Sequence, residues 1–321
     1  MSAPPLRRLA ALLALPLSVA GAQAPAGDFH QHLFSPAAAA MLSTPAATVP
    51  TLTAAEVVSL LDSAGIRRAM VLSVAYMYGS PARSVADERE KVRAENDWTA
   101  AQVSQYSERL AAACSVNPLK DYALDEIARC ARHPVLRRAL KLHFGNSDVR
   151  TDLPEHVERL KHAFRAANAN GMAIVVHLHA NITNARPYGA EQARTFIEHL
   201  LPEAPDVVVQ VAHLAGAGGS DNPRADRALE ALADAIARDD PRMRNVWFDV
   251  TAVVTARITE ADARKVADQI RRIGPARVLY GTDASIGANA RPRQGWAAFR
   301  TIPLTEAECG VIAANVPPYM R

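Results

Sequence analysis

Eight apolar, β-rich runs recur along the chain and alternate with amphipathic helical patterns. Strands made almost continuously of Val, Ile and Leu are typical of a parallel sheet that helices cover on its faces. Eight strand–helix units in about 300 residues indicate that the sheet closes, so the sequence predicts an α/β fold, a (β/α)8 barrel. A doubly wound open sheet is the alternative, and it is disfavoured because no GxGxxG or phosphate-binding loop follows an early strand. The eight runs cover residues 27–33, 67–76, 109–118, 137–144, 172–180, 206–216, 245–253 and 277–285.

The N-terminal 22 residues have the pattern of an export signal rather than of a folded element. Arg7 and Arg8 precede an apolar stretch that is too short to span a membrane, and the small residues Ala20, Gly21 and Ala22 offer a cleavage site before Gln23. We therefore expect residues 1–22 to be a signal peptide and residues 23–321 to form a single barrel domain. The mature protein is expected in the periplasm or outside the cell, with no attachment to the membrane after cleavage.

Composition excludes some classes of protein and leaves others open. The net charge of +3 includes Arg7 and Arg8, so the chain after the signal carries +1. Near-neutral charge, few aromatic residues and no basic run argue against nucleic-acid binding, and we expect a small-molecule substrate instead. The three cysteines include no CxxC pair, which indicates neither a thiolate zinc site nor a disulfide framework, although one disulfide bond is compatible with export.

Histidines gather at the ends of the predicted strands. Alternation along residues 137–144 places Lys141 and His143 on one face, and alternation along residues 172–180 places His177 and His179 on one face, with Leu, Ile and Val opposite. The polar set is predicted to point into the barrel, where polar groups are costly unless something satisfies them, as a bound cation does. Six of the ten histidines lie at or near strand ends: His30, His32, His143, His177, His179 and His213.

A carboxylate completes a candidate metal site. Asp283 lies at the end of the eighth run, with Leu279 and Gly281 on the same face. Three imidazoles and one carboxylate suit Zn²⁺, and neutral histidine and ionised aspartate are the forms available near neutral pH. We therefore predict a metal site made of His30, His32, His177 and Asp283. Asp28 and Asp249 are expected to support or cap this site rather than to act as catalysts.

The order of these residues resembles that of the metal-dependent amidohydrolase superfamily, and more narrowly its amidohydrolase-related branch of hydrolases, lactonases and zinc decarboxylases. The resemblance rests on the HxH pair followed in order by Lys141, His177, His213 and Asp283, and it covers residues 27–315. It implies a distorted TIM barrel of the metal-dependent hydrolase type, with His30, His32, His177 and Asp283 at the metal and His213 as the catalytic histidine.

The resemblance leaves several roles open. In two-metal members a lysine on strand four is carboxylated and bridges the ions; Lys141 could have that role or be a plain ammonium paired with a carboxylate. His143 and His179 also point inward by their alternation, so they are candidates for a second metal or for a position behind the metal ligands. One Zn²⁺ is favoured over two, and Fe²⁺ and Mn²⁺ are alternatives.

These features predict an exported metal-dependent hydrolase that uses a zinc-activated water on an amide, ester or lactone carbonyl. Asp283 would transfer the proton and His213 would stabilise the developing charge. Arg186 and Tyr76 follow predicted strands and are candidates for substrate binding, although arginine is also common in surface loops. The alternatives are a zinc-dependent non-oxidative decarboxylase of an unsaturated or aromatic carboxylic acid, and a catalytically silent metal-binding barrel.

Overall fold

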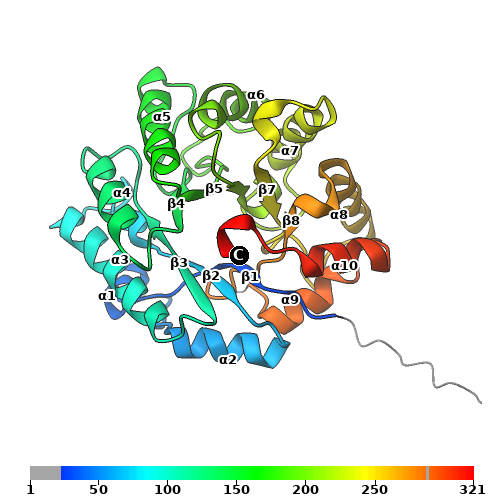
Figure 1. The fold of residues 1–321 in the computed structure, drawn as a ribbon, viewed down its shortest axis with the longest axis horizontal. Helices are drawn as coiled ribbons and strands as arrows, with labels where there is room; N and C mark the ends of the chain where they lie inside the picture. Colours follow the sequence, from blue (N-terminus) through cyan, green and yellow to red (C-terminus); the bar gives the residue numbers. More distant parts are fainter. Residues whose placement is uncertain (1–22, 287–288) are drawn as a thin grey trace, which may run out of the picture.

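Eight parallel strands form a single sheet that curves into a barrel. The computed structural model describes residues 23–286 and 289–321. The strands pair in sequence order from β1 to β8, every pair is parallel, and helices surround them as a ring (Figure 1). The predicted (β/α)8 barrel is thus confirmed. The strands are β1 Asp28–Gln31, β2 Ala69–Leu72, β3 Leu110–Ser115, β4 Ala139–His143, β5 Ala173–His177, β6 Val209–Val211, β7 Val246–Asp249 and β8 Val278–Leu279.

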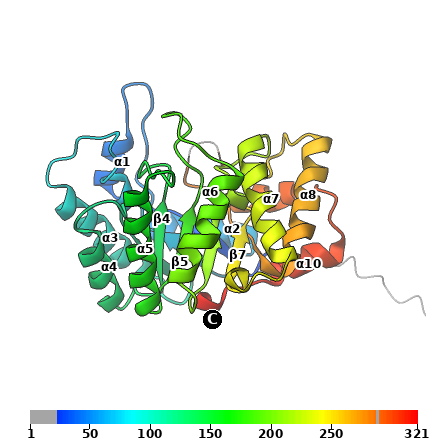
Figure 2. The ribbon, with the colours of Figure 1, turned by 90° about the horizontal axis from the view of Figure 1, so that it is seen from above.

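The helices cover the outside of the barrel, and connections of different lengths, including long loops at one end, join them to the strands (Figure 2). The longer helices are α1 Pro36–Leu42, α2 Ala54–Ala64, α3 Glu88–Ser104, α4 Ala123–Arg132, α5 Pro154–Ala169, α6 Ala190–Thr195, α7 Pro223–Ala237, α8 Glu260–Ile273, α9 Pro292–Phe299 and α10 Glu306–Ala314. The short helical turns are η1 Ala75–Met77, η2 Phe196–Leu200, η3 Leu201–Glu203, η4 Ala212–Ala215, η5 Pro241–Met243, η6 Pro275–Arg277 and η7 Pro318–Met320.

Local sequence signals set the ends of these helices. Thr53 caps α2 through a reciprocal pair of hydrogen bonds with Glu56, and Gly65 ends the helix in the left-handed region at φ 69°. Pro154 begins α5, where its missing N–H costs nothing. These residues set where the helices begin and end, and the packing of apolar helix residues such as Leu61 and Phe164 in the large core holds the helices on the outside of the barrel.

The barrel closes between its first and last strands. The N–H of Phe29 donates to the carbonyl of Tyr280 at 2.9 Å, and the N–H of Asp283 donates to the carbonyl of His30 at 2.8 Å. Gly281 permits this close approach, because a Cβ at that position would lie 2.9 Å from the Cβ of His30. Closure therefore brings the end of β8 beside the HxH pair, although 250 residues separate them in sequence.

The alternation predicted for β4 and β5 is confirmed. Leu140, Leu142, Ile174 and Val176 belong to the large core between the barrel and its helices. A smaller cluster fills the interior of the barrel. It contains Met70, Leu72, Ala113, Ala139, Ala173 and Val175. The inward positions nearest the carboxyl ends of the same strands are polar, so the apolar filling stops below the candidate site.

A disulfide bond joins Cys114 of β3 to Cys130 of α4, and Cys309 is a buried free thiol. The sequence left this pairing open. The bond ties one helix to the barrel wall across 16 residues of chain.

We expect removal of this disulfide bond to lower the free energy of unfolding by about 3 kcal/mol, because the bond closes a loop of this length and thereby lowers the conformational entropy of the unfolded chain. The paired substitution Cys114→Ser and Cys130→Ser should lower the midpoint of urea unfolding, with Cys309→Ala as the matched control. An unchanged midpoint in the double variant would contradict the expected contribution of the disulfide bond to stability.

Among the residues that the structure describes, no helix has the length and apolar character needed to cross a membrane. The predicted signal peptide at residues 1–22 lies outside the described residues.

Candidate metal centre

Most of the predicted site residues lie at the carboxyl ends of the strands, at one end of the barrel. This is the end at which (β/α)8 barrels carry their chemistry. Each side chain leaves its strand on the inward face, or directly follows the strand in a turn. The residues brought to this end are His30 and His32 at β1, Lys141 and His143 on β4, His177 on β5, His213 in η4 and Asp283 after β8.

Three of these residues form a compact ligand group. One donor atom from each of His30, His32 and Asp283 lies within 4.8 Å of the others, and all three side chains are buried. The Nε2 atom of His32 is 3.6 Å from Oδ1 of Asp283, which is too long for a hydrogen bond. Within the described residues this buried Oδ1 has no hydrogen-bond partner. An unpartnered carboxylate oxygen that faces two imidazoles fits a divalent cation, because the cation would satisfy it.

Hydrogen bonds behind the two imidazoles fix which nitrogen faces the group. Nδ1 of His32 lies 2.6 Å from the carbonyl oxygen of Leu72, and Nδ1 of His30 lies 3.1 Å from Oδ2 of Asp249. Both partners only accept hydrogen bonds, so each Nδ1 carries the proton and each Nε2 keeps a free lone pair. Both histidines are therefore held in the tautomer that a metal ligand needs.

His213 is held in a strained turn beside this group. His213, Leu214 and Ala215 all lie in the left-handed region, with φ of 54°, 48° and 63°, and Asp283 has φ 52°. Such a conformation costs a non-glycine residue roughly 1–3 kcal/mol and is concentrated at functional sites. The N–H of His213 donates to Oδ1 of Asp249 at 2.9 Å, and its Nδ1 donates to the carbonyl of Thr251 at 2.8 Å. Its Nε2 is consequently a free base, and its ring lies 4.8 Å from that of His30.

The carboxylate of Asp249 is a shared hydrogen-bond acceptor for several residues of the site. It accepts hydrogen bonds from the ring of His30, from Nε2 of Gln210 at 2.7 Å, and from the backbone N–H groups of His213 and Thr251. Burial raises the pKa of Asp249, but the His30 imidazole and the other donors outweigh burial and hold the pKa below its usual range. The sequence predicted a supporting role for this carboxylate. It missed Gln210, although a glutamine within the apolar run VVVQVA is a signal for an inward polar position.

Burial keeps the histidines of the site neutral. It lowers the pKa of His30 to about 3, with a further lowering by the charge of Lys141, and it lowers the pKa values of His32, His143, His177 and His213 as well. Burial also raises the pKa of Asp283 well above its ordinary value. Neutral imidazoles have lone pairs available for a metal or a proton.

Lys141 lies between these groups and is only 1% exposed. Burial lowers the pKa of its ammonium to about 8, while Asp249 and Asp283 act in the opposite direction. A buried lysine with such a pKa releases its proton more readily than a surface lysine does.

His177 does not join the group of His30, His32 and Asp283. Its ring stacks on that of His143 with centroids 3.8 Å apart and lies 5.0 Å from the ring of His213. His177 and His213 therefore form a second pair of imidazoles beside the first group. Its assignment to the same metal ion stays a prediction.

The two histidines of ambiguous role differ in their surroundings. Nδ1 of His143 accepts the N–H of Asn146 at 3.1 Å, so in the neutral ring Nε2 carries the proton and His143 acts as a hydrogen-bond donor. Nε2 of His179 lies 3.1 Å from the amide nitrogen of Asn222, and its ring contacts Tyr188. Neither arrangement favours a second-metal ligand.

The two predicted substrate-binding residues also differ. Tyr76 is buried in η1 with its ring 5.0 Å from that of His143, so it belongs to the wall of the site. The guanidinium of Arg186 makes two hydrogen bonds to Asp148, at 2.9 and 2.7 Å. Its charge is thus already paired, and substrate binding by Arg186 stays a prediction without support from the geometry.

We expect the metal-free protein to lose stability as the pH falls from about 6.5 toward 3. Between these values the unfolded chain binds protons on histidine that the folded chain excludes, so acid favours unfolding. Asp28, whose pKa burial raises to about 6, and Asp283 have the opposite effect, but the buried histidines outnumber them. Urea unfolding of chelated protein between about pH 7 and pH 4 measures this slope, and a flat profile would contradict it.

Solved structures share this fold along nearly the whole chain. The 5-carboxyvanillate decarboxylase of Sphingomonas paucimobilis has a TM-score of 0.60 at 17% identity, covering 91% of this chain and 97% of that one. A probable 2-pyrone-4,6-dicarboxylic acid hydrolase of Acinetobacter baumannii has a TM-score of 0.57 at 15% sequence identity, covering 90% of this chain and 96% of that one. A dihydroxybenzoic acid decarboxylase of Polaromonas, solved with bound manganese and an inhibitor, has a TM-score of 0.59 at 14% sequence identity, covering 91% of this chain and 95% of that one. At these identities the likeness establishes the fold alone.

The family is established by sequence. No curated protein sequence matches this chain. A family model described as amidohydrolase matches residues 28–310, a span that includes β1 with its HxH pair and Asp283 after β8. The resemblance stated from the sequence is confirmed: this chain belongs to the amidohydrolase family.

Proposed function

We propose that this protein is a divalent-metal-dependent enzyme whose metal is held by His30, His32 and Asp283. The observation that supports this is the convergence of two imidazole lone pairs on a buried carboxylate oxygen that has no partner among the described residues. A divalent cation there would supply Lewis acidity and lower the pKa of a bound water. Zn²⁺ and Mn²⁺ both suit this donor set.

The reaction that we propose is the non-oxidative decarboxylation of a planar, unsaturated or aromatic carboxylic acid. Two of the three similar structures described above are decarboxylases of aromatic acids, which favours this reaction over the hydrolysis that the sequence suggested first. The site offers a matching surface, because the rings of Tyr76, His143 and His177 follow one another with centroid separations of 5.0 and 3.8 Å. A planar acid could pack against the edges or the outer faces of such a row of rings.

Three side chains of the site would have separate roles in this reaction. Asp283, whose pKa burial raises, would deliver a proton to the carbon that bears the carboxylate. The bond to the carboxylate carbon then breaks, its electron pair stays with the substrate, and CO₂ leaves. The ammonium of Lys141 and the Nε2–H of His143 would bind the anionic substrate oxygens, and solvent returns the proton to Asp283.

Hydrolysis of an ester, amide or lactone is the second candidate. It is favoured by the pair of His177 and His213, which lies beside Lys141 and could hold a second ion if Lys141 were carboxylated. In that case Nε2 of His213 would bind the ion, and Asp283 would take the proton of an attacking water. Metal equivalents per chain, measured with and without bicarbonate, test the second ion, and intact-mass analysis tests the carboxylated lysine.

Product analysis separates the two reactions. Chelated protein reloaded with Zn²⁺ or Mn²⁺ is incubated with 2,6-dihydroxybenzoate and 5-carboxyvanillate as acids, and with 2-pyrone-4,6-dicarboxylate as a lactone. Metal-dependent release of CO₂ with one deuterium gained by the product in D₂O supports decarboxylation. Ring opening of the lactone without CO₂ supports hydrolysis. Bound metal without turnover across wider panels of acids, esters, amides and lactones would favour the silent barrel.

We also propose that the protein is exported. The disulfide bond between Cys114 and Cys130 supports this, because such bonds persist mainly outside the reducing cytosol. N-terminal sequencing of the protein from intact cells should begin at Gln23; a chain that retains Met1 and is found in the cytosol would contradict the proposal.

A further inference from the structure

The C-terminal turn of the chain closes the end of the barrel that is opposite to the metal centre. The turn η7, Pro318–Met320, crosses the middle of the ring of strands in Figure 1 and lies below the barrel in Figure 2. Arginines that precede two strands hold it there. Arg68 donates to the carbonyl of Met320 and Arg138 to the carbonyl of Tyr319, each at 3.3 Å.

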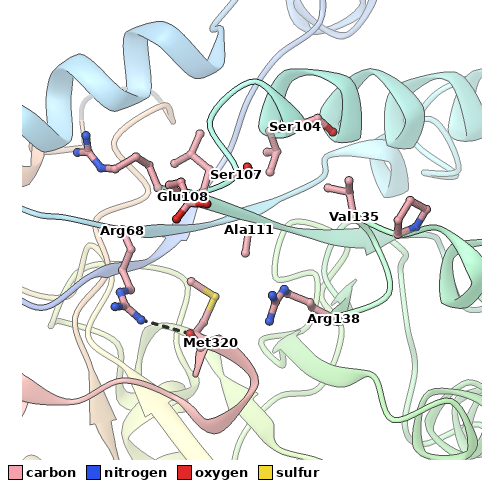
Figure 3. A pocket seen from close by; sticks show the side chains of 12 residues that line it. Arg68, Ser104, Ser107, Glu108, Ala111, Val135, Arg138 and Met320 are labelled. Atoms are coloured by element: carbon pink, nitrogen blue, oxygen red, sulfur yellow. Dashed lines mark hydrogen bonds between the residues drawn. The ribbon is translucent and has the colours of Figure 1, made fainter.

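The turn inserts side chains into the barrel rather than only covering it. Tyr319 and Met320 pack against the inward-facing apolar cluster of β2 to β5. A cavity of about 350 Å³ remains beside them, and Figure 3 shows Arg68, Arg138 and Met320 around it. The turn is thus a plug with one polar group, the hydroxyl of Tyr319, directed at the barrel interior.

That hydroxyl begins a continuous chain of hydrogen bonds to the metal centre. Tyr319 donates to Oε1 of Gln210. The other end of the same amide, Nε2 of Gln210, donates to Oδ2 of Asp249 at 2.7 Å and to the carbonyl of Phe29 at 3.3 Å. The same Oδ2 accepts the ring N–H of His30 at 3.1 Å.

The geometry points to Tyr319 as a positioning residue for the metal ligand His30, acting through Gln210 and Asp249. Gln210 is fully buried, and its Nε2 faces two groups that only accept hydrogen bonds, the carboxylate of Asp249 and the carbonyl of Phe29. This leaves Oε1 directed at Tyr319. The hydroxyl of Tyr319 donates to this Oε1 and so anchors the amide in the position from which Nε2 reaches the carboxylate. Asp249 is then held where it fixes the tautomer and ring position of His30.

This inference rests on the proposed metal centre, and Tyr319→Phe tests it by removing only the hydroxyl. We expect zinc affinity, measured by competition with a chromophoric chelator, to fall about three- to tenfold. This is less than the 10–100-fold loss typical when a direct partner of a ligating histidine is removed. The thermal midpoint of the metal-free variant should stay close to that of the wild type, since the ring still fills the same space.

Two further variants separate positioning from packing. Met320→Ala removes packing of the same C-terminal turn against the barrel but leaves the hydrogen-bond chain intact. It should therefore lower the thermal midpoint and leave zinc affinity unchanged. Gln210→Met breaks the chain at its middle, and adding Tyr319→Phe to it should cause no further loss of affinity, because the two residues act in series.

The ¹⁵N resonances of the His30 ring in metal-free protein give a readout that needs no metal. Tyr319→Phe should shift them toward a mixture of tautomers, whereas Met320→Ala should not. Zinc affinity within twofold of wild type, together with unchanged His30 resonances, overturns the inference. If the wild type binds no zinc, the proposed metal centre fails, and the His30 resonances alone decide whether Tyr319 positions the ring.

Discussion

Asp283→Asn should lower kcat by at least about a thousandfold, near the upper range expected when a proton-transfer group is lost. The amide is neutral at every accessible pH, so it can neither balance the charge of a cation nor deliver a proton. The side chain keeps its size and the backbone bond to His30, so the fold should persist. Steady-state kinetics with the substrate found by product analysis, together with metal content, measure the effect.

The matched control is Asp226→Asn. Asp226 forms a partly buried ion pair with Lys265 on the outer helices, away from the barrel interior. Its loss should leave kcat within about twofold because neither group faces the proposed metal site. If Asp283→Asn binds metal fully and retains more than about a tenth of the activity, Asp283 is not the group that transfers the proton.

Removal of the metal should abolish turnover, and reloading should restore it. Without the cation, Oδ1 of Asp283 has no partner among the described residues, and the lone pairs of His30 and His32 face it without a ligand. Dialysis against a chelator followed by titration with Zn²⁺ or Mn²⁺ gives both the loss and the recovery. Full activity in protein shown by elemental analysis to be metal-free would contradict the metal-dependent mechanism.

The same titration should raise the stability of the fold. A ligand that binds only the folded state at 100 times its dissociation constant adds about 2.7 kcal/mol to the free energy of unfolding. The rise should disappear in a variant with His30→Ala and His32→Ala, which lacks two of the three donors. A rise of equal size in that variant would show that the ion binds elsewhere.

Local pattern was sufficient to place the inward-facing residues. Alternation along β4 separated Lys141 and His143 from Leu140 and Leu142, and the structure confirms the apolar half of that division. The pattern succeeded because side chains on a strand alternate between two faces regardless of what surrounds the strand. The same alternation explains why the HxH pair indicated a shared ligand site, since residues two apart on a strand lie on the same face.

The pattern failed where a residue's role depends on partners far away in sequence. Arg186 has the charge expected of a carboxylate binder, but its guanidinium is already hydrogen-bonded to Asp148, 38 residues earlier in the sequence. The pairing of Cys114 with Cys130 was undecided because three cysteines allow three bonds, and only the packing of α4 on β3 selects one. His177 and His143 stack on each other, a contact set by the register of neighbouring strands.

The sequence by itself predicted the barrel and the inward faces of β4 and β5, because these follow from periods of two and 3.6 residues along the chain. It also named His30, His32, His177 and Asp283 as candidate metal ligands. Only the tertiary structure decided which nitrogen of His30 and His32 is free, which residues group around Oδ1 of Asp283, and that Tyr319 reaches Asp249 through Gln210. The hydrogen bonds among these residues join positions up to 219 apart in the sequence. Such bonds exist only once the barrel has closed and its C-terminal turn has docked.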